Sequence, residues 1–132
     1  MSEAVDEANA RMTPLAKLMG MTIAALEPDL VVVEMRVRED LCTLPTGLHG
    51  GAFMALADNT GAIATVANLP PVANGTTTIE SKTNFLGPAP VGTLLTATAT
   101  PLHRGRRTQV WQTRIEANGR LLAVTTQTQL VL

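Results

Sequence analysis

The sequence predicts an α+β fold, in which a long central helix is wrapped by a curved antiparallel sheet of five to six strands. Three observations carry this prediction. Residues 50–67 are almost all apolar or small, the segments after residue 76 are rich in β-branched residues, and Asn118-Gly119 is a strong two-residue hairpin signal. One buried helix followed by a long meander is best satisfied by a sheet folded around that helix.

The first elements are a short helix and a strand. In "TPLAKLMG", Thr13 can cap a helix, Pro14 suits its first position and Gly20 can supply a left-handed exit. In "LVVVEMRVR" (30–38), apolar and charged residues alternate, which is typical of a half-buried strand. We expect the following "EDLCTLPTG" (39–47) to be a loop.

The central helix raises the main question about function. It should run from about residue 50 to 67 and end at "NLPPVANG", where two prolines and Asn-Gly follow. Small residues leave room for the close approach of backbone, another subunit or a ligand, yet Asp58 stands among them. A buried carboxylate costs several kcal/mol unless it is paired or reached by water. None of the residues three or four positions away on the helix can pair with its charge.

Strands fill the rest of the chain. "TTTIESKTNF" (76–85) alternates and is ended by "GPAPVG", and "TLLTATATPLH" (93–103) and "TQVWQTRIE" (108–116) are joined around Gly105. The Asn-Gly turn then leads into "RLLAVTTQTQLVL" (120–132). With no internal repeat and no linker, we expect residues 1–132 to form a single domain.

Composition limits the partners. The net charge is −1, so the whole molecule has no electrostatic attraction to nucleic acid or membrane. Residues 1–58 carry nine acidic and four basic side chains, whereas residues 81–132 carry six basic and one acidic. The basic half could receive an anionic ligand. A single cysteine, no apparent signal peptide and no long apolar run favour a cytoplasmic protein.

Several kinds of site are excluded. The only serines are Ser2 and Ser81, and there is no Gly-x-Ser-x-Gly, so a serine nucleophile is not expected. Cys42, His49 and His103 lack metal-ligand spacing, and we expect no metal. Neither a P-loop nor a dinucleotide fingerprint is present, so no cofactor is expected. The few aromatic residues argue against base stacking.

What remains is His-Gly-Gly at the helix entrance together with Asp58. Backbone N–H groups at a helix N-terminus can stabilise an oxyanion on a carbonyl. Asp58 lies roughly 10–12 Å along the helix from this entrance. The carboxylate is therefore too far from its own helix start to act on the same carbonyl, whereas two helices in a dimer could meet.

Three segments, "HGGAFMALAD", "TPLAKLMGM" and "TTTIESKTNFLGPAPVG", together resemble the hotdog-fold acyl-CoA thioesterases of the PaaI (phenylacetate-degradation) type, from about Thr13 to Leu132. The resemblance implies a helix in a curved sheet, edge-to-edge dimers with the active site between subunits, and dimers paired into tetramers. It also implies that Gly50 N–H binds the thioester carbonyl and that Asp58 is the general base or nucleophile. His49 would position the thioester, and Thr78 would help hold the lytic water.

The same resemblance implies substrate-binding positions. Gly51 lies beside Gly50, and Asn84 and Phe85 belong to the matching Asn-Phe-Leu-x-Pro-Ala segment. Thr43 stands where many relatives carry Asn, which puts the contact at the acyl carbonyl in question. Arg104, Arg106 and Arg107 surround a tight turn suited to the phosphates of CoA.

Each of these positions also has a structural interpretation. Asp58 could be a buried acid paired with an arginine, His49 a loop histidine, and Gly50 and Gly51 could simply permit a tight helix entry. Thr78 could be an ordinary strand threonine, and the three arginines could be a solvated hairpin tip.

The leading function is hydrolysis of an aryl- or medium-chain acyl-CoA by a homo-oligomer. One alternative is a non-catalytic acyl-CoA-binding or sensing protein, although a sensor gains nothing from a base beside a hydrolysable bond. A hotdog hydratase or dehydratase is a further alternative, disfavoured because those enzymes need a differently spaced His and acid.

Overall fold

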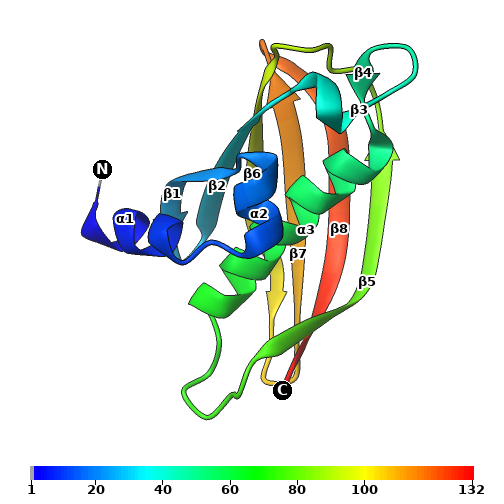
Figure 1. Ribbon diagram of the computed structural model, residues 1–132. Coiled ribbons are helices and arrows are strands. Elements are labelled where there is room, and N and C mark those ends of the chain that lie inside the picture. The colour runs from blue at the N-terminus through cyan, green and yellow to red at the C-terminus, as the bar shows by residue number, and fades with distance from the viewer. Residues whose placement is uncertain (1) are drawn as a thin grey trace.

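The computed structural model describes residues 2–132 and contains a six-stranded antiparallel sheet with one long helix across its face (Figure 1). The strands are arranged in the order β1-β2-β6-β7-β8-β5. The helices are α1 (Glu3–Ala10), α2 (Pro14–Met19) and α3 (Gly50–Ala67); the sheet strands are β1 (Thr22–Glu27), β2 (Leu30–Arg36), β5 (Thr76–Phe85), β6 (Leu94–Arg104), β7 (Thr108–Ala117) and β8 (Arg120–Val131).

The core lies between α3 and the sheet. α3 contacts β2, β5, β6, β7 and β8, and crosses them obliquely (Figure 1). Leu56 and Ala57 on the helix and Trp111 and Ile115 on β7 are fully buried there. Burial of such side chains is worth about 1.5–3 kcal/mol each for the larger ones, so this interface fixes the helix against the sheet. The predicted α+β architecture is confirmed.

The local signals for the two predicted helices are also confirmed. Thr13 caps α2 through its side chain, Pro14 opens it, and Gly20 ends it with a left-handed φ of 79°. α3 spans residues 50–67 as expected, with His49 as its N-cap. At the β7–β8 hairpin, Asn118 and Gly119 have φ values of 52° and 73°, as the Asn-Gly signal predicts.

The sequence did not reveal α1 and β1 as separate elements. α1 buries only Val5, so it has no apolar face long enough to show a helical period. Its position depends on a tertiary contact, because the Asn9 side chain both donates to Ile23 O and accepts from Ile23 N. β1 pairs with β2 through an irregular register near Ile23, which masks the alternation of a regular strand.

The segment expected to be a loop before α3 has more structure than predicted. It contains a 3₁₀ turn (Glu39–Leu41) and a small hairpin of β3 (Cys42–Thr43) and β4 (Gly47–Leu48). The backbone N–H of His49 donates to Leu41 O, so the 3₁₀ turn anchors the residue that caps α3.

β5 forms one edge of the sheet. The alternation of residue types in its sequence does not place the apolar side chains on a buried face. Ile79 is 57% and Phe85 is 51% exposed, although both are large and apolar. A register shift between Thr78 and Glu80 redirects the side chains along the strand. The edge therefore presents unpaired backbone groups beside half-exposed apolar side chains.

No helix among residues 2–132 is long and apolar enough to cross a membrane.

Candidate active site

Asp58 lies half-buried in the middle of α3 and is held by groups from the sheet. The Thr78 hydroxyl on β5 donates to Asp58 Oδ1 over 3.0 Å. On β8, Gln127 Nε2 lies 3.4 Å from the Asp58 backbone oxygen and 3.5 Å from Oδ1. Oδ2 accepts no hydrogen bond from residues 2–132. One carboxylate oxygen is thus fixed while the other stays free to take a proton.

The partners of Asp58 come from strands rather than from its own helix, which is why helical spacing alone could not find them. The structural alternative of a partner arginine is not met, because none of the ion pairs among residues 2–132 includes Asp58. A signal for the true partners did exist. In "TTQTQ" (125–129), glutamines recur every second residue, which places both on one face of a strand.

The small-residue side of α3 is filled from within the chain at Gly61. A Cβ placed on Gly61 would overlap Gln127 Oε1 and Cδ. Only a glycine lets this glutamine reach under the helix to the backbone of Asp58. The small residues of α3 were expected to leave room for backbone, another subunit or a ligand. At Gly61 the space is instead filled by the side chain of Gln127 from β8.

The entrance of α3 is more open. His49 is exposed, and its Nδ1 accepts from Gly51 N–H over 2.8 Å, which caps the helix. The neighbouring Gly50 N–H meets no acceptor among residues 2–132. Phe85, at the end of β5, packs beside Gly50 and edge-to-face with Phe53, with ring centroids 6.0 Å apart. The entrance therefore holds one unused donor next to an aromatic wall.

These contacts sort the predicted site residues into groups. Thr78 and Asp58 are hydrogen-bonded, whereas His49, Gly50, Gly51 and Phe85 gather at the helix start. Gly51 is occupied by the histidine cap, so its N–H is not available for a ligand while that bond persists.

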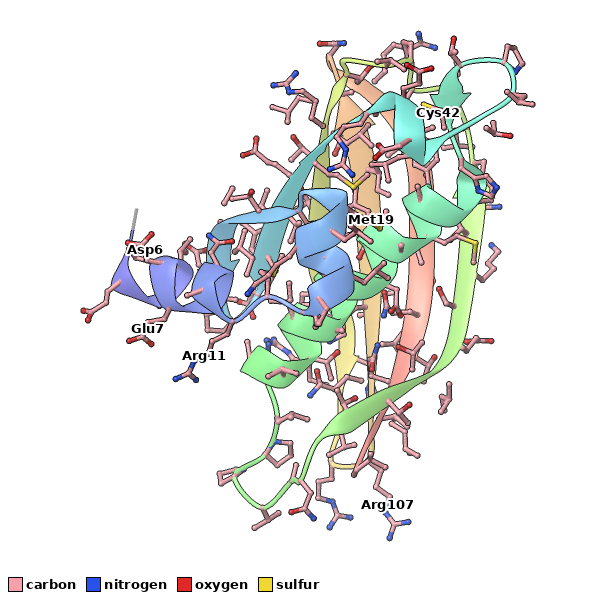
Figure 2. All side chains as sticks on the ribbon, in the orientation of Figure 1. Asp6, Glu7, Arg11, Met19, Cys42 and Arg107 are labelled. Atoms are coloured by element: carbon pink, nitrogen blue, oxygen red, sulfur yellow. The ribbon has the colours of Figure 1, made fainter. Side chains whose placement is uncertain are left out.

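Among residues 2–132, the remaining predicted residues make no hydrogen bond to these two groups, although Asn84 directly precedes Phe85. Thr43 is exposed in the β3–β4 hairpin, and exposed Asn84 accepts from Lys82 Nζ. The arginines are at the β6–β7 turn, and Figure 2 shows Arg107 at the end of the molecule opposite Cys42.

Arg104 differs from the other two arginines because it is bound within the chain. Its Nη1 donates to Asp29 Oδ1 over 2.7 Å, and also to the backbone oxygen of Pro28 and to Asn68 Oδ1. It links the β1–β2 turn to the residue that ends α3. Arg106 and Arg107 are exposed at the turn, so of the three they are the better placed to meet a phosphate.

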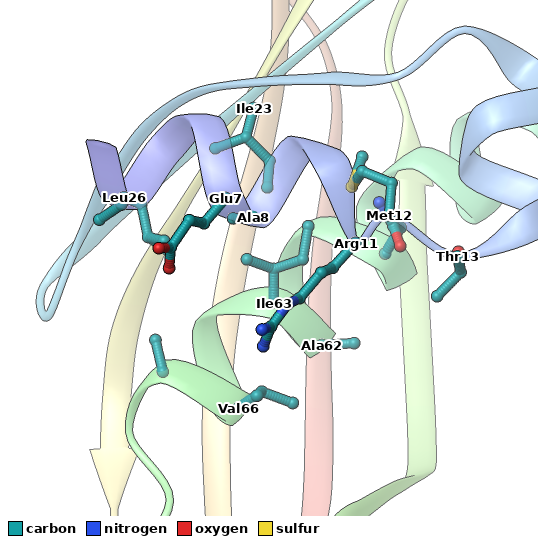
Figure 3. A pocket seen from close by; sticks show the side chains of 13 residues that line it. Glu7, Ala8, Arg11, Met12, Thr13, Ile23, Leu26, Ala62, Ile63 and Val66 are labelled. Carbon is teal, nitrogen blue, oxygen red and sulfur yellow. The ribbon is translucent and has the colours of Figure 1, made fainter. Parts of the chain in front are cut away.

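A separate cavity of about 480 Å³ opens on the opposite flank of α3, where α1 and β1 face it. Figure 3 shows Arg11, the residue that follows α1, extending over Ile63 toward Val66. Asp58 and Thr78 do not line this cavity. Over residues 2–132, no group of three or more metal-ligating side chains comes together.

The sequence of this chain is similar to known thioester hydrolases. Residues 47–124 match the family model described as the thioesterase superfamily. The chain is 32% identical over 103 residues to a 1,4-dihydroxy-2-naphthoyl-CoA hydrolase of Listeria monocytogenes, covering 76% of this chain and 80% of that protein. It is 34% identical over 101 residues to the acyl-coenzyme A thioesterase PaaI of Escherichia coli, covering 76% of this chain and 69% of that one.

Solved structures of thioesterases also superpose on nearly the whole chain. A thioesterase of Haemophilus influenzae superposes with a TM-score of 0.91 at 28% identity, covering 100% of this chain and 92% of that one. The PaaI protein of Escherichia coli superposes with a TM-score of 0.87 at 25% identity, covering 98% and 91%. The chain therefore belongs to the thioesterase superfamily, as a hotdog-fold thioester hydrolase of the PaaI type.

Proposed function

We propose that this protein hydrolyses the thioester of an aryl- or medium-chain acyl-CoA, with Asp58 as the general base and Gly50 N–H as the oxyanion donor. The observation that carries the proposal is the asymmetric carboxylate, in which Thr78 holds Oδ1 while Oδ2 accepts no hydrogen bond from the described residues. A base that is oriented on one oxygen and open on the other can take a proton from a bound water. We place this reaction in the cytoplasm, in keeping with the free Cys42.

The chemistry needs few groups because a thioester is already activated. Water bound at Asp58 attacks the carbonyl carbon, and its proton passes to Oδ2. The negative charge that develops on the carbonyl oxygen is stabilised by Gly50 N–H at the positive end of the α3 dipole. Collapse of the tetrahedral intermediate breaks the C–S bond and leaves the free acid, and the departing CoA thiolate takes the proton from Oδ2, which regenerates the carboxylate. Direct attack by Asp58 on the carbonyl carbon, through an acyl-carboxylate anhydride that water then hydrolyses, is the nucleophilic form of the same site.

A second copy of the chain is needed to complete the site. Gly50 and Asp58 are eight residues apart on one straight helix, about 12 Å along its axis. Attacking water and carbonyl carbon must come within about 3–3.5 Å. We therefore propose that Gly50 of one copy faces Asp58 of another in a dimer joined at the β5 edges, and that dimers pair into tetramers. His49 then stands beside the bound thioester, and Thr78 near the water.

Support for an aryl or apolar acyl group comes from the wall around Gly50 and from the relatives. Phe85 is half-exposed beside the unused donor, where it can pack on an apolar group. One relative is named for a naphthoyl thioester and another as an acyl-CoA thioesterase. Other parts of the substrate are proposed to contact Asn84 and Thr43, which are both exposed. Gly51 could join them once its hydrogen bond to His49 is broken.

The test is release of free CoA thiol from a panel of aryl- and aliphatic acyl-CoAs by wild type, Asp58→Asn and Asp6→Asn. Asp6 is an exposed carboxylate on α1 and serves as the matched control. Asp58→Asn is expected to lower kcat by about 10²-fold or more, and Asp6→Asn to leave it unchanged. Stable binding of acyl-CoA by all three proteins without turnover would instead identify a binding or sensing protein.

For CoA itself we propose that Arg106 and Arg107 contact its phosphates. Arg106→Ala and Arg107→Ala should each raise KM for acyl-CoA by about two- to ten-fold, the range for one hydrogen bond, with kcat unchanged. The same acyl group on N-acetylcysteamine lacks every phosphate and should show no such increase. An equal increase on both substrates would rule out phosphate recognition.

A further inference from the structure

We infer that Gln129 is a positioning residue that fixes the direction of the hydrogen bond from Thr78 to Asp58. Gln129 lies on β8 directly opposite Thr78 on β5, and its side chain is 1% exposed. Its Nε2 donates to Thr78 Oγ1 over 2.7 Å, and Thr78 Oγ1 in turn donates to Asp58 Oδ1. The inference rests on the proposed function, because it assigns Gln129 a role through the proposed base.

The charge on the carboxylate determines which group is the donor and which the acceptor in each of these hydrogen bonds. An ionised Asp58 can only accept, so the single proton of the Thr78 hydroxyl is directed to Oδ1. Thr78 Oγ1 then has only lone pairs left for Gln129, and the atom 2.7 Å away must be the amide nitrogen. This leaves Gln129 Oε1 facing Thr76, whose hydroxyl lies 3.0 Å from it. The amide nitrogen thus donates to Thr78, while the Thr76 hydroxyl is shared between Gln129 Oε1 and the backbone oxygen of Leu130, 2.9 Å away.

Burial makes this arrangement difficult to explain by packing alone. A primary amide buried to this extent costs free energy unless it is hydrogen-bonded, and an apolar side chain of similar size would fill the same space. Two other glutamines are buried in the same sheet, and neither is hydrogen-bonded to Thr78. Gln109 bridges Trp111 Nε1 and the backbone oxygen of Asn68, while Gln127 leaves its Oε1 without a partner among residues 2–132. Gln127 reaches Asp58 directly, at 3.4 and 3.5 Å, whereas Gln129 is the glutamine that donates to Thr78 and so acts on the proposed base through that hydroxyl.

Without the Gln129 donor, Thr78 can rotate about χ1 and direct its proton away from Asp58, so the carboxylate loses its fixed oxygen. We expect Gln129→Leu to lower kcat by about three- to ten-fold, the range for one hydrogen bond, while KM stays the same. Gln129→Glu keeps the size and the acceptor for Thr76 but replaces the donor with a second acceptor. Thr78 would then donate to the introduced carboxylate instead of to Asp58, and kcat should fall at least as far.

The experiment compares kcat and KM for Gln129→Leu, Gln129→Glu and the control Gln109→Leu, with the two Gln129 variants also made in a Thr78→Val background. If Gln129 acts through Thr78, its substitutions should change kcat less than two-fold once Thr78 is gone, and Gln109→Leu should retain kcat per folded protein. Thermal unfolding of each variant gives the folded fraction, and the isosteric Gln129→Glu provides the test if Gln129→Leu does not fold.

The inference is overturned if both Gln129 variants keep wild-type kcat, or if they lower kcat by the same factor with and without Thr78. An equal loss in Gln109→Leu would also overturn it, because buried amides in general would then be responsible. Failure of this inference can be distinguished from failure of the proposed function, because in the second case Asp58→Asn would retain full activity.

Discussion

The middle of α3 and its entrance are built in different ways, although both belong to the candidate site. In the middle, Asp58 is half-buried and its Oδ1 is fixed by Thr78, behind which Gln129 is almost fully buried. At the entrance, His49 is exposed, Phe85 is half-exposed, and Gly50 N–H finds no acceptor in the part of the chain that the structure describes. The proposed base is thus held in place within one chain, whereas the proposed oxyanion donor has no acceptor among residues 2–132. The two regions should respond differently to substitution.

The largest effect on folding is expected at Gly61, in the middle of the helix. Gly61→Ala puts a Cβ within 2.8 Å of three atoms of Gln127, whose side chain is fully buried and has little room to move. Overpacking of this kind costs about 1–3 kcal/mol, and thermal unfolding should occur several degrees lower. Gly51→Ala is the matched change at the entrance, where the nearest atom to the added Cβ is the capping Nδ1 of His49, 3.0 Å away on an exposed side chain that can shift.

Gly51→Ala should change the free energy of unfolding by no more than about ±0.5 kcal/mol, which is the range of an ordinary surface substitution. Both proteins are to be measured at the same concentration, since assembly of copies also affects stability. Equal destabilisation by the two changes would contradict the difference between a packed middle and an open entrance.

A smaller effect is expected at His49, and it separates helix capping from chemistry. His49→Ala removes the acceptor for Gly51 N–H and should lower the free energy of unfolding by about 0.5–2 kcal/mol. His49→Asn should restore that stability, because asparagine is a favoured N-cap. Thiol-release kinetics of the stable His49→Asn variant then measure what the His49 side chain contributes to catalysis and substrate binding apart from capping the helix. If kcat and KM match wild type, His49 is only a cap.

The smallest effect is expected at Phe85. Phe85→Leu keeps apolar bulk but removes the edge-to-face pair with Phe53, worth about 0.5–1.5 kcal/mol. Ile79→Leu is the control on the same strand, because Ile79 is similarly exposed and should change stability very little. Chemical denaturation at matched protein concentration measures both variants. A loss at Ile79 as large as at Phe85 would mean that the β5 edge as a whole, and not the aromatic pair, is responsible.

Local signals were sufficient for the elements whose structure depends on nearby residues. The bounds of α3, the cap and exit of α2 and the Asn118-Gly119 turn follow from capping, apolar content and backbone preference within a few residues. α1 and β1 could not be predicted in the same way, because the Asn9–Ile23 contact that holds them together spans the elements.

By itself, the sequence determined that an acid lies in a helix of small and apolar residues and that glycines open this helix. The tertiary structure alone decided what surrounds that acid. Thr78, Gln127 and Gln129 are 20 or more positions away in sequence and reach Asp58, directly or through Thr78, only because β5 and β8 pair beneath α3. The bulge after Thr78 and the position of Gln127 against Gly61 depend on the strand register, which is set by the whole sheet and not by any short segment.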